Sequence, residues 1–196
     1  ISAFRIAPIY NVGAIRNAEM SPEIYPGWIC RFYLGSDVPQ ETENKLKEFN
    51  HVEVVNMDEE NDWQGMFWRF YAIDLEDDVE IVISRDTDSR LSQREYEAVV
   101  EWLISGKYLH IMRDHPDHSE PIMGGMWGCL VKDFIRKINQ EIYIKYGMDE
   151  VVNLKRVLKD WLSNEHRRTT HNEPNCYKPE HYTSKGIDQR FLGDFI

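Results

Sequence analysis

The sequence has little cysteine and no long apolar run. Its three cysteines, Cys30, Cys129 and Cys176, lie far apart and lack CxxC spacing, which argues against a disulfide framework and a structural zinc site. A reducing, cytoplasmic compartment is therefore expected. No apolar run approaches the roughly 18 residues that a membrane-spanning helix needs, and no signal peptide is visible. The first residue is not Met and an apolar segment begins at once, which is compatible with residues preceding Ile1.

Positive charge is also scarce. The chain has 23 Lys and Arg against 34 Asp and Glu, a formal net charge of −11, which makes a nucleic acid an unsuitable partner because phosphate backbones bind basic surfaces. Such an acidic protein needs a divalent cation or a few well-placed arginines to bind a diphosphate. Hydrophobic residues make up 42% of the 196-residue chain, enough for one folded domain with its own core.

Strand patterns alternate with helix patterns along the sequence. This alternation predicts an α/β fold, an αβα sandwich with a mostly parallel central sheet. A helix over 10–20 is expected to end near Pro22 and Pro26, because proline interrupts the hydrogen bonding of a helix. The predicted strands are 1–4, 28–34, 51–57, 79–84 and 107–112, and the other predicted helices are 39–49, 63–75, 92–104, 127–146 and 150–164.

The strand predicted at 79–84 is followed by the polar segment RDTDSRL, residues 85–91. In parallel α/β sheets, ligands bind beyond the carboxyl ends of the strands. Asp86 and Asp88, two positions apart at such an end, are therefore candidate ligands for Mn²⁺ or Mg²⁺, cations that take oxygen ligands and share their shell with substrate phosphates. The alternative is an ordinary acidic turn, since Asp and Ser favour turns.

Four segments together resemble a known family: GMFWRF (65–70), ISRDTDSRLSQRE (83–95), HIMRDHPDH (110–118) and IMGGMWG (122–128). They are similar, in order, to small GT-A-fold glycosyltransferase domains of chlorella viruses and of bacterial polysaccharide clusters. The resemblance runs from Ile1 to about Met148 and returns at 186–192. It implies a Rossmann-like GT-A fold and metal-dependent transfer of a sugar from a nucleotide-sugar, commonly UDP-linked, to a carbohydrate acceptor. For a viral protein the compartment would be the host cytoplasm.

The resemblance also implies an organisation within a single domain, 1–196. Residues 1–95 would form the nucleotide-binding half, which ends in the DxD motif. Residues 96–196 would form the sugar and acceptor half, with a polar loop near 165–185. In the family, donor-binding positions lie at the first strand, on the helix before the motif and around the motif itself. The matching residues here are Ser2, Ala3, Phe4, Arg5, Arg69, Arg85 and Thr87.

Further matches fall later in the chain. Asp114 and His115 lie in a polar loop where they are candidate bases, although a solvated loop is the alternative. The Gly124-Gly125 pair would let the backbone approach a sugar, or would simply precede a helix. Asp188 and Gln189 resemble the DQ segment of retaining, galactosyl-type relatives, where the Asp lies near the anomeric carbon; a helix-capping Asp is the alternative. The histidine that usually supplies a third metal ligand in relatives has no match here.

Three other functions use the same features. A haloacid-dehalogenase-like phosphatase also places a DxD after an apolar strand, but normally on its first strand, whereas about 80 residues of α/β pattern precede it here. A nucleotidyltransferase also pairs carboxylates with a metal, and a non-catalytic sugar- or nucleotide-binding module needs no chemistry at all. The sequence does not identify the sugar or the acceptor, and both retaining and inverting chemistry stay open.

Overall fold

The computed structural model describes residues 2–3, 8–58, 63–73, 78–113 and 122–146. These ranges form a mixed α/β fold, which confirms the predicted class at that level. The strands form two three-stranded sheets, one parallel and one antiparallel. The prediction of a single, mostly parallel sheet is therefore wrong for the part of the chain that is described.

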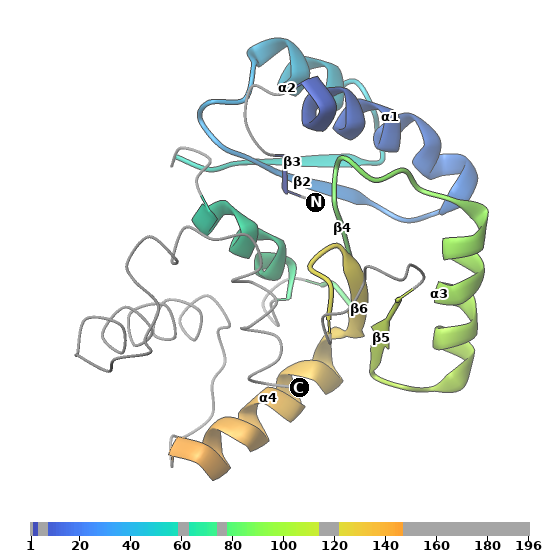
Figure 1. Ribbon diagram of the computed structural model, residues 1–196, viewed down its shortest axis with the longest axis vertical. Helices are drawn as coiled ribbons and strands as arrows, with labels where there is room; N and C mark the ends of the chain where they lie inside the picture. The colour runs from blue at the N-terminus through green and yellow to red at the C-terminus, as the bar shows by residue number, and fades with distance from the viewer. Residues whose placement is uncertain (1, 4–7, 59–62, 74–77, 114–121, 147–196) are drawn as a thin grey trace, which may run out of the picture.

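The parallel sheet has the order β1-β2-β3, with β1 at Ser2–Ala3, β2 at Cys30–Leu34 and β3 at Val52–Asn56. Helices α1 (Pro8–Ile24) and α2 (Gln40–Lys47) cover one face, and the 3₁₀ helix η1 (Trp63–Ala72) lies on the other side (Figure 1). The buried side chains between the sheet and the two α-helices are Ala14, Ala18, Phe32, Leu34 and Leu46.

The antiparallel sheet has the order β4-β6-β5, with β4 at Ile81–Arg85, β5 at Leu109–Ile111 and β6 at Met126–Leu130. Helix α3 (Gln93–Ser105) runs beside this sheet, and α4 (Val131–Tyr146) follows β6 directly (Figure 1). The aromatic centre of this half is a stack in which Trp127 lies 5.5 Å from Phe70 and 6.1 Å from Phe134 between ring centroids.

The helix predicted over 127–146 is wrong at its start, because residues 126–130 form β6 and the helix begins only at Val131. Gly128 explains the difference. Glycine is unfavourable inside a helix, and here a Cβ on Gly128 would come within 2.9 Å of the Val82 carbonyl oxygen and 2.8 Å of Ile83 Cγ2. The residue is therefore suited to close packing against β4, with which β6 pairs in the register Ile83↔Gly128.

Helix α1 ends at Ile24, between Pro22 and Pro26 as predicted, and Pro22 itself lies inside the helix. Proline has no N–H to donate to the carbonyl four residues earlier, so the Ala18 carbonyl loses its usual helical partner. His51 replaces that partner, since its Nε2 donates to the Ala18 oxygen at 2.8 Å. A side chain just before β3 thus satisfies the helix at the position where proline would otherwise leave an unpaired acceptor.

The other predicted elements are present with shifted ends. The Ser92 hydroxyl accepts from the Glu95 backbone N–H at 3.4 Å and so caps the start of α3. The strand predicted at 79–84 is β4, which begins two residues later and extends through Arg85. The helix predicted over 150–164 lies outside the described residues. Across those residues no helix is both long and apolar enough to cross a bilayer.

Candidate functional site

The DTDS segment forms the turn that leaves β4. The strand ends at Arg85, Asp86 follows it, and Thr87 and Asp88 make the turn that leads towards α3. The three motif residues differ in exposure: Thr87 is buried, the Asp86 side chain is 45% exposed, and Asp88 is exposed. Both carboxylates are thus presented at the carboxyl end of a strand, as the sequence predicted, while the residue between them anchors the turn.

Asp86 is held from two sides. Its Oδ1 lies 3.0 Å from Nη1 of Arg69, whose side chain is only 4% exposed, and Arg69 Nε donates to the Met66 carbonyl at 2.9 Å. On the other side is Gly125, where a Cβ would lie 2.2 Å from Asp86 Oδ2. A buried guanidinium and a residue without a side chain therefore fix the direction of the first carboxylate. The resemblance suggested Arg69 near the donor phosphates, and the structure places it beside the motif.

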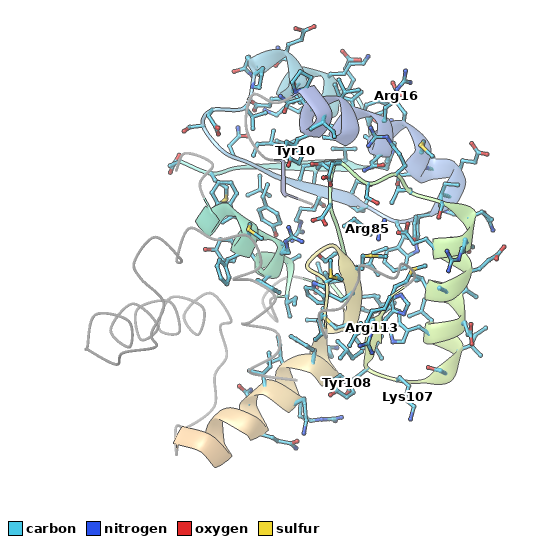
Figure 2. All side chains as sticks on the ribbon, viewed as in Figure 1. Tyr10, Arg16, Arg85, Lys107, Tyr108 and Arg113 are labelled. Atoms are coloured by element: carbon cyan, nitrogen blue, oxygen red, sulfur yellow. The ribbon has the colours of Figure 1, made fainter. Side chains whose placement is uncertain are left out.

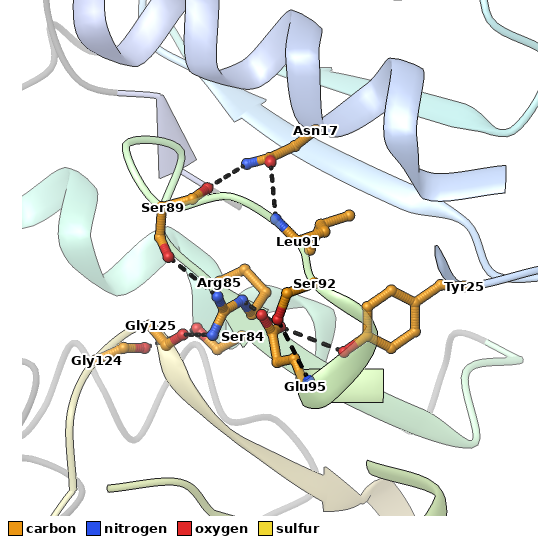
Figure 3. A network of polar contacts seen from close by, with 10 residues as sticks. All are labelled: Asn17, Tyr25, Ser84, Arg85, Ser89, Leu91, Ser92, Glu95, Gly124 and Gly125. Carbon is orange, nitrogen blue, oxygen red and sulfur yellow. Dashed lines mark hydrogen bonds and ion pairs between the residues drawn. The ribbon is translucent and has the colours of Figure 1, made fainter. Parts of the chain in front are cut away.

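Helix α1 holds the rest of the turn (Figure 3). A Cβ on Gly13 would lie 1.9 Å from the Thr87 carbonyl oxygen, so the helix backbone packs directly on the motif. One turn later, the fully buried Asn17 donates from Nδ2 to the Ser89 carbonyl at 2.8 Å and accepts from the Leu91 N–H at 3.3 Å. Helix α1 therefore contacts the turn at Thr87, Ser89 and Leu91.

Sequence reasoning missed Gly13 and Asn17. A signal was present, because the buried positions of α1 are all small or polar at helical spacing: Asn11, Gly13, Ala14, Asn17, Ala18 and Ser21. Such a face is typical of a helix that approaches another backbone closely rather than one that packs on large apolar side chains.

Arg85 points into the protein rather than towards solvent. Figure 2 shows it in the interior, whereas Arg16 lies on the outer surface of α1. Its Nη1 donates to the Gly125 carbonyl at 3.0 Å and its Nη2 to the Ser89 hydroxyl at 3.1 Å. One guanidinium therefore joins the end of β4, the turn and the start of β6. These contacts give Arg85 a positioning role, and its predicted role in donor binding stays a prediction.

The charge of Arg85 is balanced by a buried carboxylate on α3. Arg85 Nε lies 2.7 Å from Glu95 Oε1, and both side chains are 7% exposed. Tyr25 donates its hydroxyl to the same oxygen at 3.3 Å (Figure 3). Burial, and then the charge of Glu95, hold the pKa of Tyr25 well above its ordinary value, so the phenol keeps its proton and remains a donor. This network links the residue that follows α1 to β4 and α3, next to the turn.

Gly124 and Gly125 are held in place by β4. Ser84 donates its hydroxyl to the Gly124 carbonyl at 2.8 Å, and Arg85 donates to the next carbonyl. The pair therefore lies against the motif in the structure. Its contact with a sugar stays a prediction. Trp127, two residues after Gly125, is buried in the aromatic stack described above.

The arrangement fits a hard divalent cation in its donor set. Asp86 and Asp88 supply oxygen ligands on one partly exposed turn, and Mn²⁺ or Mg²⁺ commonly takes one or two carboxylates and completes its shell with phosphate and water. Within the described ranges no group of three His, Cys, Asp or Glu side chains is placed to hold a metal by itself.

The remaining predicted residues are only partly described. Ser2 and Ala3 form β1 and pair with Tyr33 and Leu34 of β2. Six others lie outside the described residues, and their predicted roles stay predictions: Phe4, Arg5, Asp114, His115, Asp188 and Gln189.

Comparisons of the chain with protein-family models, with curated proteins and with solved structures found no match. The geometry around Asp86 and Asp88 is therefore the basis for a functional assignment.

Proposed function

We propose that this protein is a group-transfer enzyme that acts on the diphosphate of a nucleotide-linked substrate. More specifically, we propose a metal-dependent glycosyltransferase that moves a sugar from a nucleotide-sugar, with UDP the expected nucleotide, to a carbohydrate acceptor. The proposed domain is GT-A-like. One observation carries the proposal: at the end of β4, one carboxylate is fixed between Arg69 and Gly125 and a second, exposed carboxylate follows on the same turn.

The charges around the turn support a diphosphate ligand. Asp86 and Asp88 would hold Mn²⁺ or Mg²⁺, which, when bound, supplies positive charge that stabilises the leaving diphosphate. Arg69 lies beside Asp86 and is buried, so its charge is screened less by water than that of a surface arginine. A planar guanidinium is suited to phosphate oxygens. In this proposal Arg69 keeps Asp86 oriented and adds a cation at the edge of the diphosphate site.

The rigidity of the turn supports catalysis rather than binding alone. Stabilisation of developing charge is most effective when the groups are already in place before the reaction. Here Gly13, Asn17 and Arg85 hold the turn on its buried side. Asp188 with Gln189 would serve a retaining reaction. In an inverting reaction, Asp114 or His115 would take the acceptor proton.

The proposal is tested by incubating the protein with a panel of UDP-sugars and acceptor glycans, with and without Mn²⁺. UDP release should require the metal and should fall by roughly 10²–10³-fold in Asp86→Asn and Asp88→Asn. Glu101→Gln, an exposed carboxylate on α3, is the matched control and should behave as wild type. The anomeric proton coupling of the product in NMR then distinguishes retention from inversion.

Other outcomes would point to the alternative functions. Inorganic phosphate released from simple esters indicates the phosphatase, and pyrophosphate released from nucleoside triphosphates indicates the nucleotidyltransferase. Metal-dependent binding of nucleotide-sugars without turnover of any of them indicates a binding module. Transfer that is unaffected by chelation or by both aspartate substitutions would remove the role proposed for the turn.

A further inference from the structure

A cavity of about 530 Å³ lies between the two sheets. Cys30, Arg31 and Tyr33 of β2 line one side, and the whole of β4, Ile81–Arg85, lines the other. The cavity reaches Ser84 and Arg85 at one end and Asp78 at the other, so it runs along the length of β4. Its shape is therefore set by two strands rather than by the DTDS turn.

Both strands turn an open edge towards this cavity. On one side β2 pairs with β3 along its whole length, but on the other side its pairs within the described residues are limited to Tyr33 and Leu34, with β1. β4 is the edge strand of its sheet. Among the described residues no backbone hydrogen bond joins β2 to β4. Open edges present rows of N–H and C=O groups that are suited to pairing with another strand.

The faces of the cavity are covered by helices. Ser21 comes from α1 and Tyr25 directly follows that helix, whereas Arg69 and Ala72 come from η1. Figure 1 shows α1 and η1 on opposite sides of the parallel sheet. A strand in the cavity would therefore be covered on both faces, as strands in α/β sheets are.

The register of β1 shows how a strand would enter. Ser2 pairs with Tyr33 and Ala3 with Leu34, a constant offset of 31 residues (33 − 2 and 34 − 3). At the same offset, the position three residues before Ser2 lies beside Cys30. A chain that continues β1 backwards in extended conformation thus passes along the open part of β2, on the side where β4 lies.

We propose that the cavity receives an extended polypeptide segment, joined through Ile1 to the N-terminal side of β1 and running parallel to β2. This segment would bond to β2 on one edge and to β4 on the other, which would turn the two three-stranded sheets into one continuous sheet. Because both faces are covered, its side chains would be mainly apolar on both sides. This strand site does not depend on the proposed enzymatic function.

The test is the full chain carrying an apolar extension of about five residues before Ile1, roughly the length of β2. A cysteine is placed three residues before Ser2, so that it lies beside Cys30. Adjacent strands are about 4.8 Å apart, which is within the Cα separation of a disulfide. Mild oxidation is carried out at about pH 9, because burial raises the pKa of the Cys30 thiol. Cys176→Ser in the background removes a competing thiol.

The expected result is an intramolecular disulfide to Cys30 that forms at least about tenfold faster than in a matched control, whose cysteine is moved one position and so points to the opposite face. Equal rates for the two positions, or disulfides formed only between two molecules, would overturn the proposal.

A second measurement does not depend on oxidation. Compared with a Gly-Ser extension of the same length, the apolar extension should slow amide exchange in Ile81–Arg85 by about tenfold or more, because those backbone groups gain partners. It should also raise the melting temperature by roughly 2–8 °C. Unchanged exchange in β4 would contradict strand addition, whatever nucleotide-sugar assays show.

Discussion

At the scale of single residues, the motif depends on positions where any side chain is excluded. Gly13 touches the Thr87 carbonyl and Gly125 touches the Asp86 carboxylate, so the two glycines lie on either side of the same turn. The contacts are with backbone and with a carboxylate that Arg69 already holds, and neither can move away easily. Glycine is therefore needed at these two positions because the turn packs closely against them, and not because the backbone there adopts unusual dihedral angles.

Gly13→Ala is expected to destabilise the fold by about 1–3 kcal/mol, because the added methyl would overlap the Thr87 carbonyl. The sign of this change in stability is informative, since Gly→Ala inside an ordinary helix stabilises the protein by about 0.5–1 kcal/mol. The free energy of unfolding from urea titrations measures the effect. Val12→Ala, at an exposed position of the same helix, should stay within about 0.5 kcal/mol of wild type. A more stable Gly13→Ala protein would show that α1 does not contact the turn.

The carboxylates of the site could be predicted from the sequence, but their supports could not. Asp86 and Asp88 follow an apolar strand directly, so their placement is a local property. Asn17 acts on a carbonyl 72 residues away and Glu95 on Tyr25 70 residues away. No local pattern encodes such pairings.

At the scale of elements, sequence periodicity predicted the helices and strands whose partners are close in the chain. It failed at β6, which is a strand because it pairs with β4 more than 40 residues earlier. It also did not predict that α1 includes Pro22, where His51 supplies the missing donor. In both cases a tertiary contact outweighs the local preference.

The hydrogen bond between His51 and α1 predicts that substitutions at positions 51 and 22 are energetically coupled. His51→Ala should cost about 1–3 kcal/mol, since the carbonyl of the buried Ala18 loses its donor. Pro22→Ala supplies a backbone N–H for the same carbonyl. The His51→Ala substitution should therefore cost less in the Pro22→Ala background, with a coupling energy of at least about 0.5 kcal/mol in a double-mutant cycle. Strictly additive effects would mean that the two groups do not share the Ala18 oxygen.

At the scale of the whole molecule, the part built on the parallel sheet and the part built on the antiparallel sheet meet around the buried pair of Arg85 and Glu95. His110 of β5 lies close to this region, stacked on Trp102 of α3 with ring centroids 5.3 Å apart. Arg85, Glu95, Tyr25 and His110 line one small cavity together. Burial, and then the positive charge of Arg85, lower the pKa of His110.

This pKa shift predicts that stability falls on the acidic side. A histidine whose folded pKa is lowered is held neutral by the fold, so its contribution is present above the ordinary value of about 6.5 and is lost as the pH falls through the folded pKa. Titration of one proton changes the free energy of unfolding by at most about 1.4 kcal/mol per pH unit. The change should be smaller here because the His110 ring is only half-buried. Urea unfolding at several pH values measures it. His110→Gln should flatten the profile below neutrality, and an unchanged profile would assign the acid sensitivity to other groups.

The glycine contacts have a consequence for directed evolution of this protein. A library that randomises the neighbourhood of the DTDS turn will lose most of its members to misfolding if it includes positions 13 and 125, because every substitution there adds atoms where backbone or carboxylate already lies. Ser89 and Arg90 also contact the turn through their side chains, so the exposed positions Gln93 and Arg94 at the start of α3 are better suited to carry the diversity. A selection for altered ligand preference should therefore keep both glycines constant.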